Sequence, residues 1–288
     1  MKVGVIGIGL IGGSIARDLG GKGHEVYGYD RLPVHEDIAI STGLIQSSLP
    51  LEELCKTCDV IFVSIPVDLA VDVLSEVLDN IGWNSVVIDT GSTKASICHG
   101  LRNHKKRGRF VASHPLAGTE FSGPKAALSG LFSGKKNIIC EEHASDEDAL
   151  STAIELMDEM EMQTLFMNAE EHDKHMAYVS HLSHVSAFML STTVLDIEKD
   201  QKQIVNLAST GFQSTVRLAK SSSRTWAPIF NDNSANILKA LETYIDHLTE
   251  LKEAIRIGDK EEVMNLIERS NDIKRVLSGM KHNIVKLS

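Results

Sequence analysis

The amino-terminal segment constrains the fold of this chain more than any other part of the sequence. Residues 2–6 (KVGVI) are mostly apolar and β-branched, which is typical of a buried strand, and Gly7 follows them directly. Gly7, Gly9 and Gly12 have the spacing G-x-G-x-x-G, and a helical pattern covers residues 11–20. Glycines at these positions permit a tight turn, a close approach of the backbone to a diphosphate and close packing of helix on strand. The segment therefore predicts a strand, a phosphate-binding turn and a helix.

Strands and helices alternate through the rest of the first half. Four further apolar segments are predicted strands: 24–30 (HEVYGYD), 59–65 (DVIFVSI), 85–89 (SVVID) and 109–113 (RFVAS). This alternation is typical of a parallel sheet with helices on both faces, so the predicted fold class is α/β, a Rossmann dinucleotide-binding domain. After a glycine-rich loop over residues 115–135, strands at 137–140 and 163–167 complete it. The predicted first domain spans residues 1–168.

The second half, residues 169–288, belongs to a different class. Beyond residue 168 we find no convincing strand, and helical periodicity dominates, which predicts an all-α domain. One apolar stripe recurs at helical spacing through Ile237, Leu241, Tyr244, Ile245, Leu248, Leu251 and Ile255. The stripe is either a face on which two chains pair into a homodimer or the internal core of a helical bundle.

Charge and hydropathy argue against two kinds of partner. The formal net charge is −10, which disfavours nucleic acid, whose affinity depends on clustered Lys and Arg. The basic cluster Lys105-Lys106-Arg107 is interpreted as the solvated end of a helix over residues 94–106. The longest apolar runs, such as residues 60–67, are far shorter than the roughly 20 residues of a membrane-spanning helix. With no evident signal peptide, we expect a cytoplasmic protein without a membrane partner.

Cysteines and histidines raise the alternatives of a redox site or a metal site. Cys55 and Cys58 form a C-x-x-C, but they lie between an amphipathic segment and an apolar strand, and no second C-x-x-C completes a zinc site. We therefore interpret them as packing residues. Helically spaced histidines occur at His172, His175, His181 and His184. No carboxylate–histidine set among them has a familiar ligand spacing, so we predict a pocket wall with exposed neighbours and no metal.

Asp30 is the candidate determinant of cofactor choice. It ends the second predicted strand, 18 residues after Gly12, where an acidic side chain accepts hydrogen bonds from ribose hydroxyls. A carboxylate there would also repel a 2′-phosphate, which favours NAD over NADP. Arg31, also a predicted cofactor contact, complicates this interpretation, because an arginine can hold that phosphate. Further cofactor contacts are predicted at Leu10, Ile11, Ser64 and Pro66.

Three predicted strands end in segments that carry candidate chemistry: 64–66 (S-I-P), 89–94 (D-T-G-S-T-K) and 113–120 (S-H-P-L-A-G-T-E). Ligands of this fold bind beyond the carboxyl ends of the strands, so we expect the segments to converge on the nicotinamide. His114 is the candidate general base, because an ordinary pKa near 6.5 suits taking a hydroxyl proton as hydride leaves the same carbon. Ser92 either orients the same hydroxyl or caps the helix that follows.

The motifs, taken together and in this order, resemble the prephenate/arogenate dehydrogenase family over nearly the whole chain. The glycine motif reads G-x-G-L-I-G-G-S, and D-x-G-S-x-K and S-H-P-x-A-G-T-E follow it. In the second half, residues 179–184 (V-S-H-L-S-H) are similar to the family's S-H-L-P-H, and residues 211–219 (G-F-Q-S-T-V-R-L-A) to its G-F-x-D-x-T-R-x-A. We expect no fused chorismate mutase, because the chain ends soon after its last predicted helix.

The resemblance implies a reaction and a set of site residues. The reaction is the oxidative decarboxylation of prephenate to 4-hydroxyphenylpyruvate with reduction of NAD, as in tyrosine biosynthesis. His114 would be the catalytic histidine and Ser92 its hydrogen-bonding partner. His184 would belong to the substrate pocket, Arg217 would hold a substrate carboxylate, and Trp226 would reach the pocket across a dimer interface. The helical domain would thus bind substrate and form a homodimer.

Two departures from the family pattern bear on the substrate. Ser183 replaces a proline, and Ser214 replaces the aspartate that precedes the arginine. An acid near the ammonium group of arogenate would favour that compound, so its absence favours prephenate, unless Glu120 or Asp232 supplies one. Three alternatives stand beside prephenate: arogenate; a hydroxyacid dehydrogenase or pyrroline-carboxylate reductase of similar architecture but without H-P-x-A-G-T-E; and a non-catalytic NAD-binding sensor.

Overall fold

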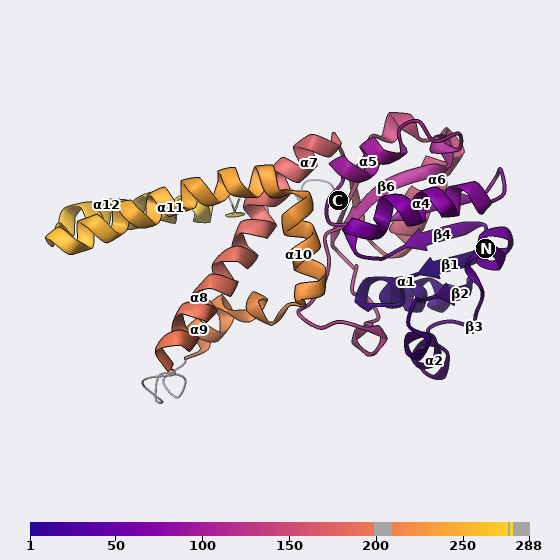
Figure 1. The fold of residues 1–288 in the computed structure, drawn as a ribbon, viewed down its shortest axis with the longest axis horizontal. Helices are drawn as coiled ribbons and strands as arrows, with labels where there is room; N and C mark the ends of the chain where they lie inside the picture. Colours follow the sequence, from indigo (N-terminus) through magenta and orange to yellow (C-terminus); the bar gives the residue numbers. More distant parts are fainter. Residues whose placement is uncertain (199–208, 276, 279–288) are drawn as a thin grey trace. The chain divides into compact units, whose positions relative to one another are not determined.

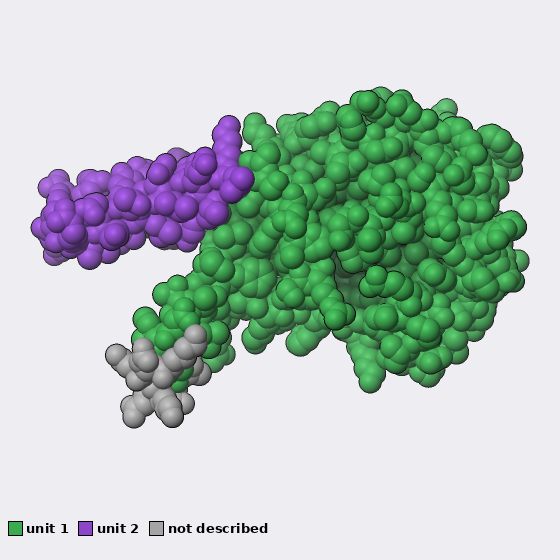
Figure 2. Space-filling view, viewed as in Figure 1, with its two compact units in different colours: residues 1–237 green, residues 238–288 purple. Residues whose placement is uncertain are grey.

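The computed structural model describes residues 1–198, 209–275 and 277–278 of the chain (Figure 1). The chain forms two compact units, Met1–Ile237 and Leu238–Ser288 (Figure 2). The first unit contains the strands and the first helices of the all-α half, and the second contains the last helices. None of the described helices combines the length and the apolar character needed to cross a membrane.

An eight-stranded sheet lies at the centre of the first unit, in the order β3-β2-β1-β4-β5-β6-β7-β8. The strands are β1 (Lys2–Ile6), β2 (Glu25–Tyr29), β3 (Ser47–Ser48), β4 (Val60–Val63), β5 (Val86–Asp89), β6 (Phe110–Pro115), β7 (Lys136–Cys140) and β8 (Gln163–Met167). The first six are parallel and have the 3-2-1-4-5-6 order of a dinucleotide-binding sheet. β7 runs antiparallel to β6, and β8 runs parallel to β7. The α/β prediction is confirmed, but the sheet is mixed rather than parallel throughout.

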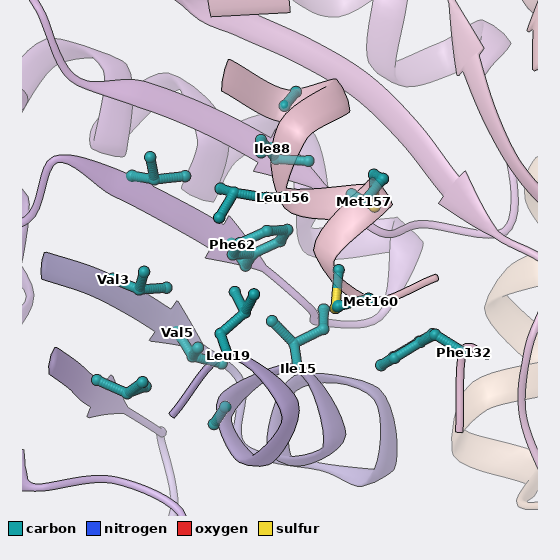
Figure 3. Packing of buried hydrophobic residues seen from close by; sticks show 14 of the residues in the cluster. Val3, Val5, Ile15, Leu19, Phe62, Ile88, Phe132, Leu156, Met157 and Met160 are labelled. Atoms are coloured by element: carbon teal, nitrogen blue, oxygen red, sulfur yellow. The ribbon is translucent and has the colours of Figure 1, made fainter. Parts of the chain in front are cut away.

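Helices cover both faces of this sheet. They are α1 (Leu10–Gly21), α2 (Pro33–Ser41), α3 (Leu51–Thr57), α4 (Ala70–Asn80), α5 (Ala95–Leu101) and α6 (Glu147–Glu159), with 3₁₀ turns η1 (Val67–Leu69), η2 (Arg107–Arg109), η3 (Pro124–Ala126) and η4 (Glu142–Ala144). Successive strand side chains point to opposite faces, so the strands contribute to two buried clusters. Ile15 of α1 and Leu156 of α6 pack with Phe62 in one cluster (Figure 3). Leu74 of α4 packs with Ile61 in the other.

The described residues after β8 contain helices and no strand, as the sequence predicts. α7 (Ala169–Met176) continues through one π-helical turn, η5 (Ala177–His181), into α8 (Leu182–Glu198). α9 (Thr210–Thr215), the 3₁₀ turn η7 (Arg217–Lys220) and α10 (Ser223–Asp232) follow, and α11 (Ser234–Ile257) and α12 (Lys260–Asn271) lie mostly in the second unit. π-helical turns are rare and frequently occur at functional sites, and η5 contains His181.

The predicted apolar stripe lies on α11 and is partly exposed. Ile237 is buried, but Ile245, Leu248 and Ile255 are each about half exposed. Exposed apolar side chains continue on α12, at Met264 for example. Contiguous exposed apolar residues are typical of an interaction surface. In the described part of the chain, the stripe is therefore enclosed only in part.

The basic cluster at residues 105–107 is not the solvated helix end that the sequence predicts. α5 ends before this cluster, and Lys106 and Arg107 are buried. Lys106 Nζ donates a hydrogen bond to the Ile81 carbonyl (2.6 Å) just beyond α4, and Arg107 Nη1 donates one to the Phe110 carbonyl (2.7 Å). The prediction was wrong because backbone carbonyls that lack partners at helix ends and loops require donors, and sequence spacing does not reveal which donors reach them.

Candidate functional site

The turn between β1 and α1 has the geometry of a phosphate cradle. Gly7 has φ +85°, in the left-handed region, and a Cβ on Gly7 would collide with the Ser64 carbonyl oxygen. A Cβ on Gly12 would collide with the Gly7 carbonyl oxygen. Nothing lies within 4 Å of the position of a Cβ on Gly9, so the backbone there is open to an approaching group. Because the N–H groups and the dipole of α1 begin at this point, the turn fits a diphosphate.

Asp30 follows β2 and is held against this turn. Its Oδ2 accepts a hydrogen bond from the Ile8 N–H (2.8 Å), and its Oδ1 accepts one from the Leu32 N–H (2.9 Å). Nδ1 of His35 lies 3.2 Å from Oδ2, whereas Arg31 is exposed. The Asp30 carboxylate therefore lies beside the glycine turn, where the sequence predicts a group that binds ribose hydroxyls.

The other predicted cofactor residues follow β1 and β4, which are neighbours in the sheet. Leu10 and Ile11 are partly buried in the first turn of α1. Ser64 follows β4, and its Oγ accepts a hydrogen bond from the Thr90 hydroxyl (3.0 Å), which follows β5. Pro66 is exposed and precedes η1. Because parallel strands end at one edge of a sheet, these residues share that edge with the glycine turn.

His114 lies in β6, at the same edge, and is buried. Its Nδ1 is 2.8 Å from Nε2 of His172 in α7, and the two rings meet edge to face. Burial lowers the pKa of His114 well below 6.5, and the charges of His172, Lys94 and His181 act in the same direction. The imidazole is therefore neutral at neutral pH, which is the state that a general base requires.

A buried ion pair braces the peptide that precedes His114. Lys94 and Asp89 are both excluded from water, and Lys94 Nζ donates hydrogen bonds to Asp89 Oδ2 and to the Ser113 carbonyl (2.8 Å). Asp89 Oδ1 accepts a hydrogen bond from the Ser113 N–H (2.9 Å). Both charges are thus satisfied inside the protein, and together they hold the backbone on the amino-terminal side of His114.

Asp173 joins α7 to the start of α5. Its Oδ1 accepts a hydrogen bond from the Lys94 N–H (2.8 Å) and its Oδ2 accepts one from the Ala95 N–H (2.9 Å), two groups that α5 cannot satisfy itself. Oδ1 also lies 2.7 Å from Nδ1 of the adjacent His172. One carboxylate therefore caps a helix and contacts the imidazole that pairs with His114.

Ser92 is partly buried in the loop that precedes α5. It does not cap α5, because the Asp173 carboxylate accepts the hydrogen bonds of the first N–H groups. Among the described residues Ser92 forms no hydrogen bond with His114, whose Nδ1 is paired with His172. The direct contact that the resemblance implies is therefore not made in this structure.

His184 and Trp226 form a second group of predicted site residues, on the helical segments. His184 of α8 stacks on Trp226 of α10, with ring centroids 3.4 Å apart. Nδ1 of His184 donates a hydrogen bond to the Ser180 carbonyl (3.0 Å), which leaves Nε2 as an acceptor in the neutral ring. Burial lowers the pKa of His184, and the charge of Arg217 acts in the same direction. The contact between His184 and Trp226 forms within one chain.

Arg217 begins η7 and is about half exposed. Its Nη1 donates a hydrogen bond to Oε2 of Glu120 (3.2 Å), the last residue of S-H-P-L-A-G-T-E. Glu120 therefore gives Arg217 the acidic partner that Ser214 cannot supply. The other candidate acid, Asp232, accepts hydrogen bonds from two hydroxyl groups around the start of α5, at 2.5 and 2.8 Å.

Four residues without an individual role predicted from sequence contact His114 or its neighbours in the structure: Asp89, Lys94, His172 and Asp173. The acid and the lysine of D-T-G-S-T-K follow a buried strand directly, and this placement is a signal that could have identified them. His172 and Asp173 carry no comparable signal in the sequence. Their link to His114 depends on how α7 packs against β6.

The C-x-x-C cysteines are buried, as expected of packing residues. Burial raises the pKa of Cys55 to about 11 and that of Cys58 to about 12, so both thiols stay protonated near neutral pH. The part of the chain that the structure describes contains no group of three or more His, Cys, Asp or Glu side chains arranged to hold a metal. Of the helical histidines, His172 pairs with His114, and His175 is exposed.

Comparison with known families covers most of the chain. Residues 15–165 match the family model of the prephenate dehydrogenase nucleotide-binding domain, and residues 168–269 match that of the prephenate dehydrogenase dimerization domain. The chain belongs to the prephenate dehydrogenase family. This membership confirms the resemblance of the motifs to the prephenate/arogenate dehydrogenases.

Individual relatives are similar over most of their length. Prephenate dehydrogenase from Lactococcus lactis is 29% identical over 283 residues, which are 96% of this chain and 77% of the relative. Aquifex aeolicus prephenate dehydrogenase, in its crystal structure with hydroxyphenyl propionate and NAD+, has 30% sequence identity to this chain. The two structures superpose with a TM-score of 0.86 over 96% of this chain and 97% of that one. Synechocystis arogenate dehydrogenase is 26% identical, with a TM-score of 0.76, over 96% and 100% of the two chains. Family membership therefore does not choose between prephenate and arogenate.

Proposed function

We propose that this protein converts prephenate to 4-hydroxyphenylpyruvate by NAD-dependent oxidative decarboxylation. The observation that carries the proposal is His114, a buried imidazole at the carboxyl end of β6 whose pKa is lowered by burial, in a chain of this family. The residues of the glycine turn fit NAD, because the backbone is open at Gly9 and the Asp30 carboxylate suits ribose hydroxyls and repels a 2′-phosphate. Bound NAD would supply the hydride acceptor for C4 of prephenate.

His114 acts as the base in this reaction. Its Nε2 takes the proton of the C4 hydroxyl while the C4–H electron pair leaves as hydride, and the oxygen becomes a carbonyl. The bond between the ring and its carboxylate then breaks, CO₂ departs, and the electron pair of that bond makes the ring aromatic. The oxygen takes back a proton from His114, so the reaction needs no further acid or base.

Arg217, His184 and Trp226 hold the substrate in this proposal. The half-exposed guanidinium of Arg217 can form charge-assisted hydrogen bonds with a carboxylate. The stacked rings of His184 and Trp226 offer a flat wall to the ring of the substrate. Because the substrate is anionic and the chain carries a net charge of −10, the local positive charge of Arg217 matters more than the overall charge.

The choice of prephenate rests on the acids around Arg217. Arogenate has an ammonium group where prephenate has a ketone, and an unpaired ammonium group is costly in a desolvated pocket. Position 214 holds a serine, Asp232 is engaged by two hydroxyl groups, and Glu120 already has Arg217 as a partner. Arogenate is the second candidate, because the Glu120 carboxylate is the acid found in contact with Arg217.

The deciding experiment measures kcat/KM for prephenate and arogenate side by side, with NAD, on the purified protein. A higher value for prephenate is expected. A tenfold preference for arogenate would overturn the substrate proposal, and Glu120→Gln would then be expected to weaken arogenate selectively. No turnover of either compound, with NAD bound, would favour the non-catalytic sensor.

The cofactor proposal has its own test at Asp30. NAD is expected to give the higher kcat/KM, because the Asp30 carboxylate repels a 2′-phosphate. Asp30→Ser should lower the ratio of kcat/KM with NAD to kcat/KM with NADP by about tenfold, the size expected for one lost charge-assisted hydrogen bond. Arg31→Ser tests the neighbouring side chain separately: if Arg31 holds the 2′-phosphate, this change should weaken NADP and leave NAD unaffected. Equal efficiency with both cofactors in the unmodified protein would contradict the proposal.

A homodimer formed through the helical half is part of the same proposal. A dimerization-domain match over residues 168–269 and the exposed apolar side chains of α11 and α12 support it. Light scattering at micromolar concentration should give twice the chain mass of 31.5 kDa. The substitution Ile245→Glu, together with Leu248→Glu, should shift the mass toward the monomer, and a monomeric unmodified protein would refute the dimer.

A further inference from the structure

Three side chains form a continuous chain of hydrogen bonds that ends at the candidate base. Asp173 Oδ1 lies 2.7 Å from Nδ1 of His172, and Nε2 of His172 lies 2.8 Å from Nδ1 of His114. All three residues are buried, so water does not compete for these contacts. Nδ1 of His172 faces Asp173, and Nε2 of His172 faces Nδ1 of His114. Which nitrogen of each ring carries a proton therefore depends on which atom of each contact can donate.

The Asp173 carboxylate determines which atom donates in each of these hydrogen bonds. Both of its oxygens already accept hydrogen bonds from backbone N–H groups, those of Lys94 and Ala95, so the carboxylate acts as an acceptor on both sides. Nδ1 of His172 must then donate to Asp173, because a carboxylate has no hydrogen to offer. In a neutral His172 this leaves the lone pair on Nε2, which accepts the hydrogen bond from His114 Nδ1–H.

We infer that His172 and Asp173 are positioning residues that hold His114 in the tautomer with Nδ1 protonated and Nε2 free. This inference rests on the proposed role of His114 as the base, because only a free Nε2 can take the hydroxyl proton. The backbone on the other side of His114 is held by the Lys94–Asp89 pair through Ser113. The Lys94–Asp89 pair therefore holds the backbone next to His114, and the His172–Asp173 pair determines which nitrogen of His114 carries the proton.

Nitrogen NMR of the unmodified protein tests the tautomer without any turnover. With ¹⁵N-histidine labelling near pH 7.5, a nitrogen without hydrogen resonates far downfield of a protonated one, and His114→Asn assigns the His114 signals by their loss. We expect His114 and His172 each to show a protonated Nδ1 and a bare Nε2. A bare Nδ1 on His114, or a His172 protonated on both nitrogens, would overturn the inference. This result does not depend on whether prephenate is the substrate.

Two substitutions at His172 separate tautomer control from simple packing. His172→Phe keeps a ring but removes the acceptor, so kcat should fall on the order of 10² while KM changes less than about threefold, since much of His114 then carries its proton on the nitrogen that must act as the base. His172→Gln retains a carbonyl that can accept from His114 Nδ1–H and an amide that can donate to Asp173. It should keep kcat within about tenfold of the unmodified enzyme.

His175→Gln, on the exposed side of the same helix, is the matched control and should leave kcat unchanged. In His172→Phe the bare Nε2 signal of His114 should be lost or averaged, whereas in His172→Gln it should persist. Equal losses of kcat in both His172 variants, or an unchanged His114 tautomer in His172→Phe, would show that His172 only packs against the base and would overturn the inference.

Discussion

The two ends of the candidate site are built differently. At one end, His114, Lys94 and Asp89 are buried, and each has a partner inside the protein. At the other end, the Arg217 side chain is 53% exposed and its partner Glu120 is 16% exposed. A charge in contact with water is screened, whereas a charge in the interior acts strongly on its neighbours. The buried end can therefore tune a proton acceptor, and the open end can bind and release an anion.

The same contrast separates the two ion pairs in their effect on folding. Lys94 and Asp89 lie out of water, so removal of one partner leaves the other as an uncompensated buried charge. Arg217 and Glu120 form an exposed pair, and water solvates either partner when the other is removed. Substitutions at the buried end should change catalysis and stability, and substitutions at the open end should change binding.

The largest expected effect is at His114. His114→Asn should lower kcat on the order of 10²–10⁴ with little change in KM, because a general base stabilises the transition state more than the bound substrate. Steady-state kinetics with prephenate and NAD would measure both constants, and the Kd for NAD serves as the control for an intact cofactor site. Near-normal turnover would refute the assignment of His114 as the base. The buried end of the site would then have no catalytic role to set against the binding role of the open end.

Lys94→Met should destabilise the fold about as strongly as any single change at this site. It leaves the Asp89 carboxylate buried and unpaired, which costs about 3–5 kcal/mol in the free energy of unfolding. Urea denaturation would measure the loss. The double variant with Asp89→Asn should recover part of it, because no buried charge then remains. A loss below about 1 kcal/mol, typical of an exposed pair, would contradict the proposed difference between the ends.

The first half of the fold could be predicted from sequence because its signals are local. Buried strands such as residues 59–65 read as apolar runs, and the glycine turn is specific once a strand precedes it. The direction of β7 could not be predicted, because an apolar run such as residues 137–140 reads the same whether the strand is parallel or antiparallel. The two-residue strand β3 is too short to give a pattern.

The candidate site could be predicted only in part, and the missing part consists of long-range contacts. His114 is recognisable because it follows a predicted strand, but its partner His172 is 58 residues away. Lys106 is polar in sequence and buried in the structure, because a carbonyl near the end of another helix accepts its hydrogen bond. Glu120 was named as a candidate acid, but its contact with Arg217 depends on how the loop after β6 meets η7.

His181 should make the stability of the protein depend on pH at the buried end. Burial lowers its pKa from 6.5 to about 4, against the nearby Asp173 charge and with those of His172 and His184. Between about pH 6.5 and 4 the unfolded chain therefore binds a proton that the folded chain does not, and stability falls as the pH falls through this window. The loss attributable to His181 is roughly 3 kcal/mol at most.

Urea denaturation at pH 7.5 and pH 4.5 would measure the contribution of His181. His181→Gln keeps a side chain that can accept the hydrogen bond from Asn233 Nδ2 (3.1 Å in the unmodified protein) but cannot be protonated in this range. It should lose less stability on acidification than the unmodified protein. His175→Gln, an exposed histidine on α7, is the control and should behave like the unmodified protein. Identical pH dependence in all three proteins would refute the prediction.

Arg217→Ala should act on binding at the open end. A charge-assisted hydrogen bond to a carboxylate exists already in the bound ground state, so KM for prephenate should rise about 10- to 100-fold while kcat changes little. KM of Arg217→Lys should lie between those of Arg217→Ala and the unmodified protein, because lysine keeps the charge but not the planar pair of donors. A fall in kcat as large as that of His114→Asn, with KM unchanged, would show that Arg217 takes part in the chemistry.

Glu120→Gln should have the smallest effect. The Arg217–Glu120 pair is exposed, so its loss should change the free energy of unfolding by less than about 1 kcal/mol. The same change removes a negative charge next to Arg217, the proposed binding group for an anionic substrate, and KM for prephenate should fall about two- to threefold at low ionic strength. This gain should vanish in 1 M salt, where charges are screened within about 3 Å. If KM instead rises and stays raised in high salt, Glu120 orients Arg217 through the hydrogen bond and not through charge, and the open end would then be preorganised like the buried one.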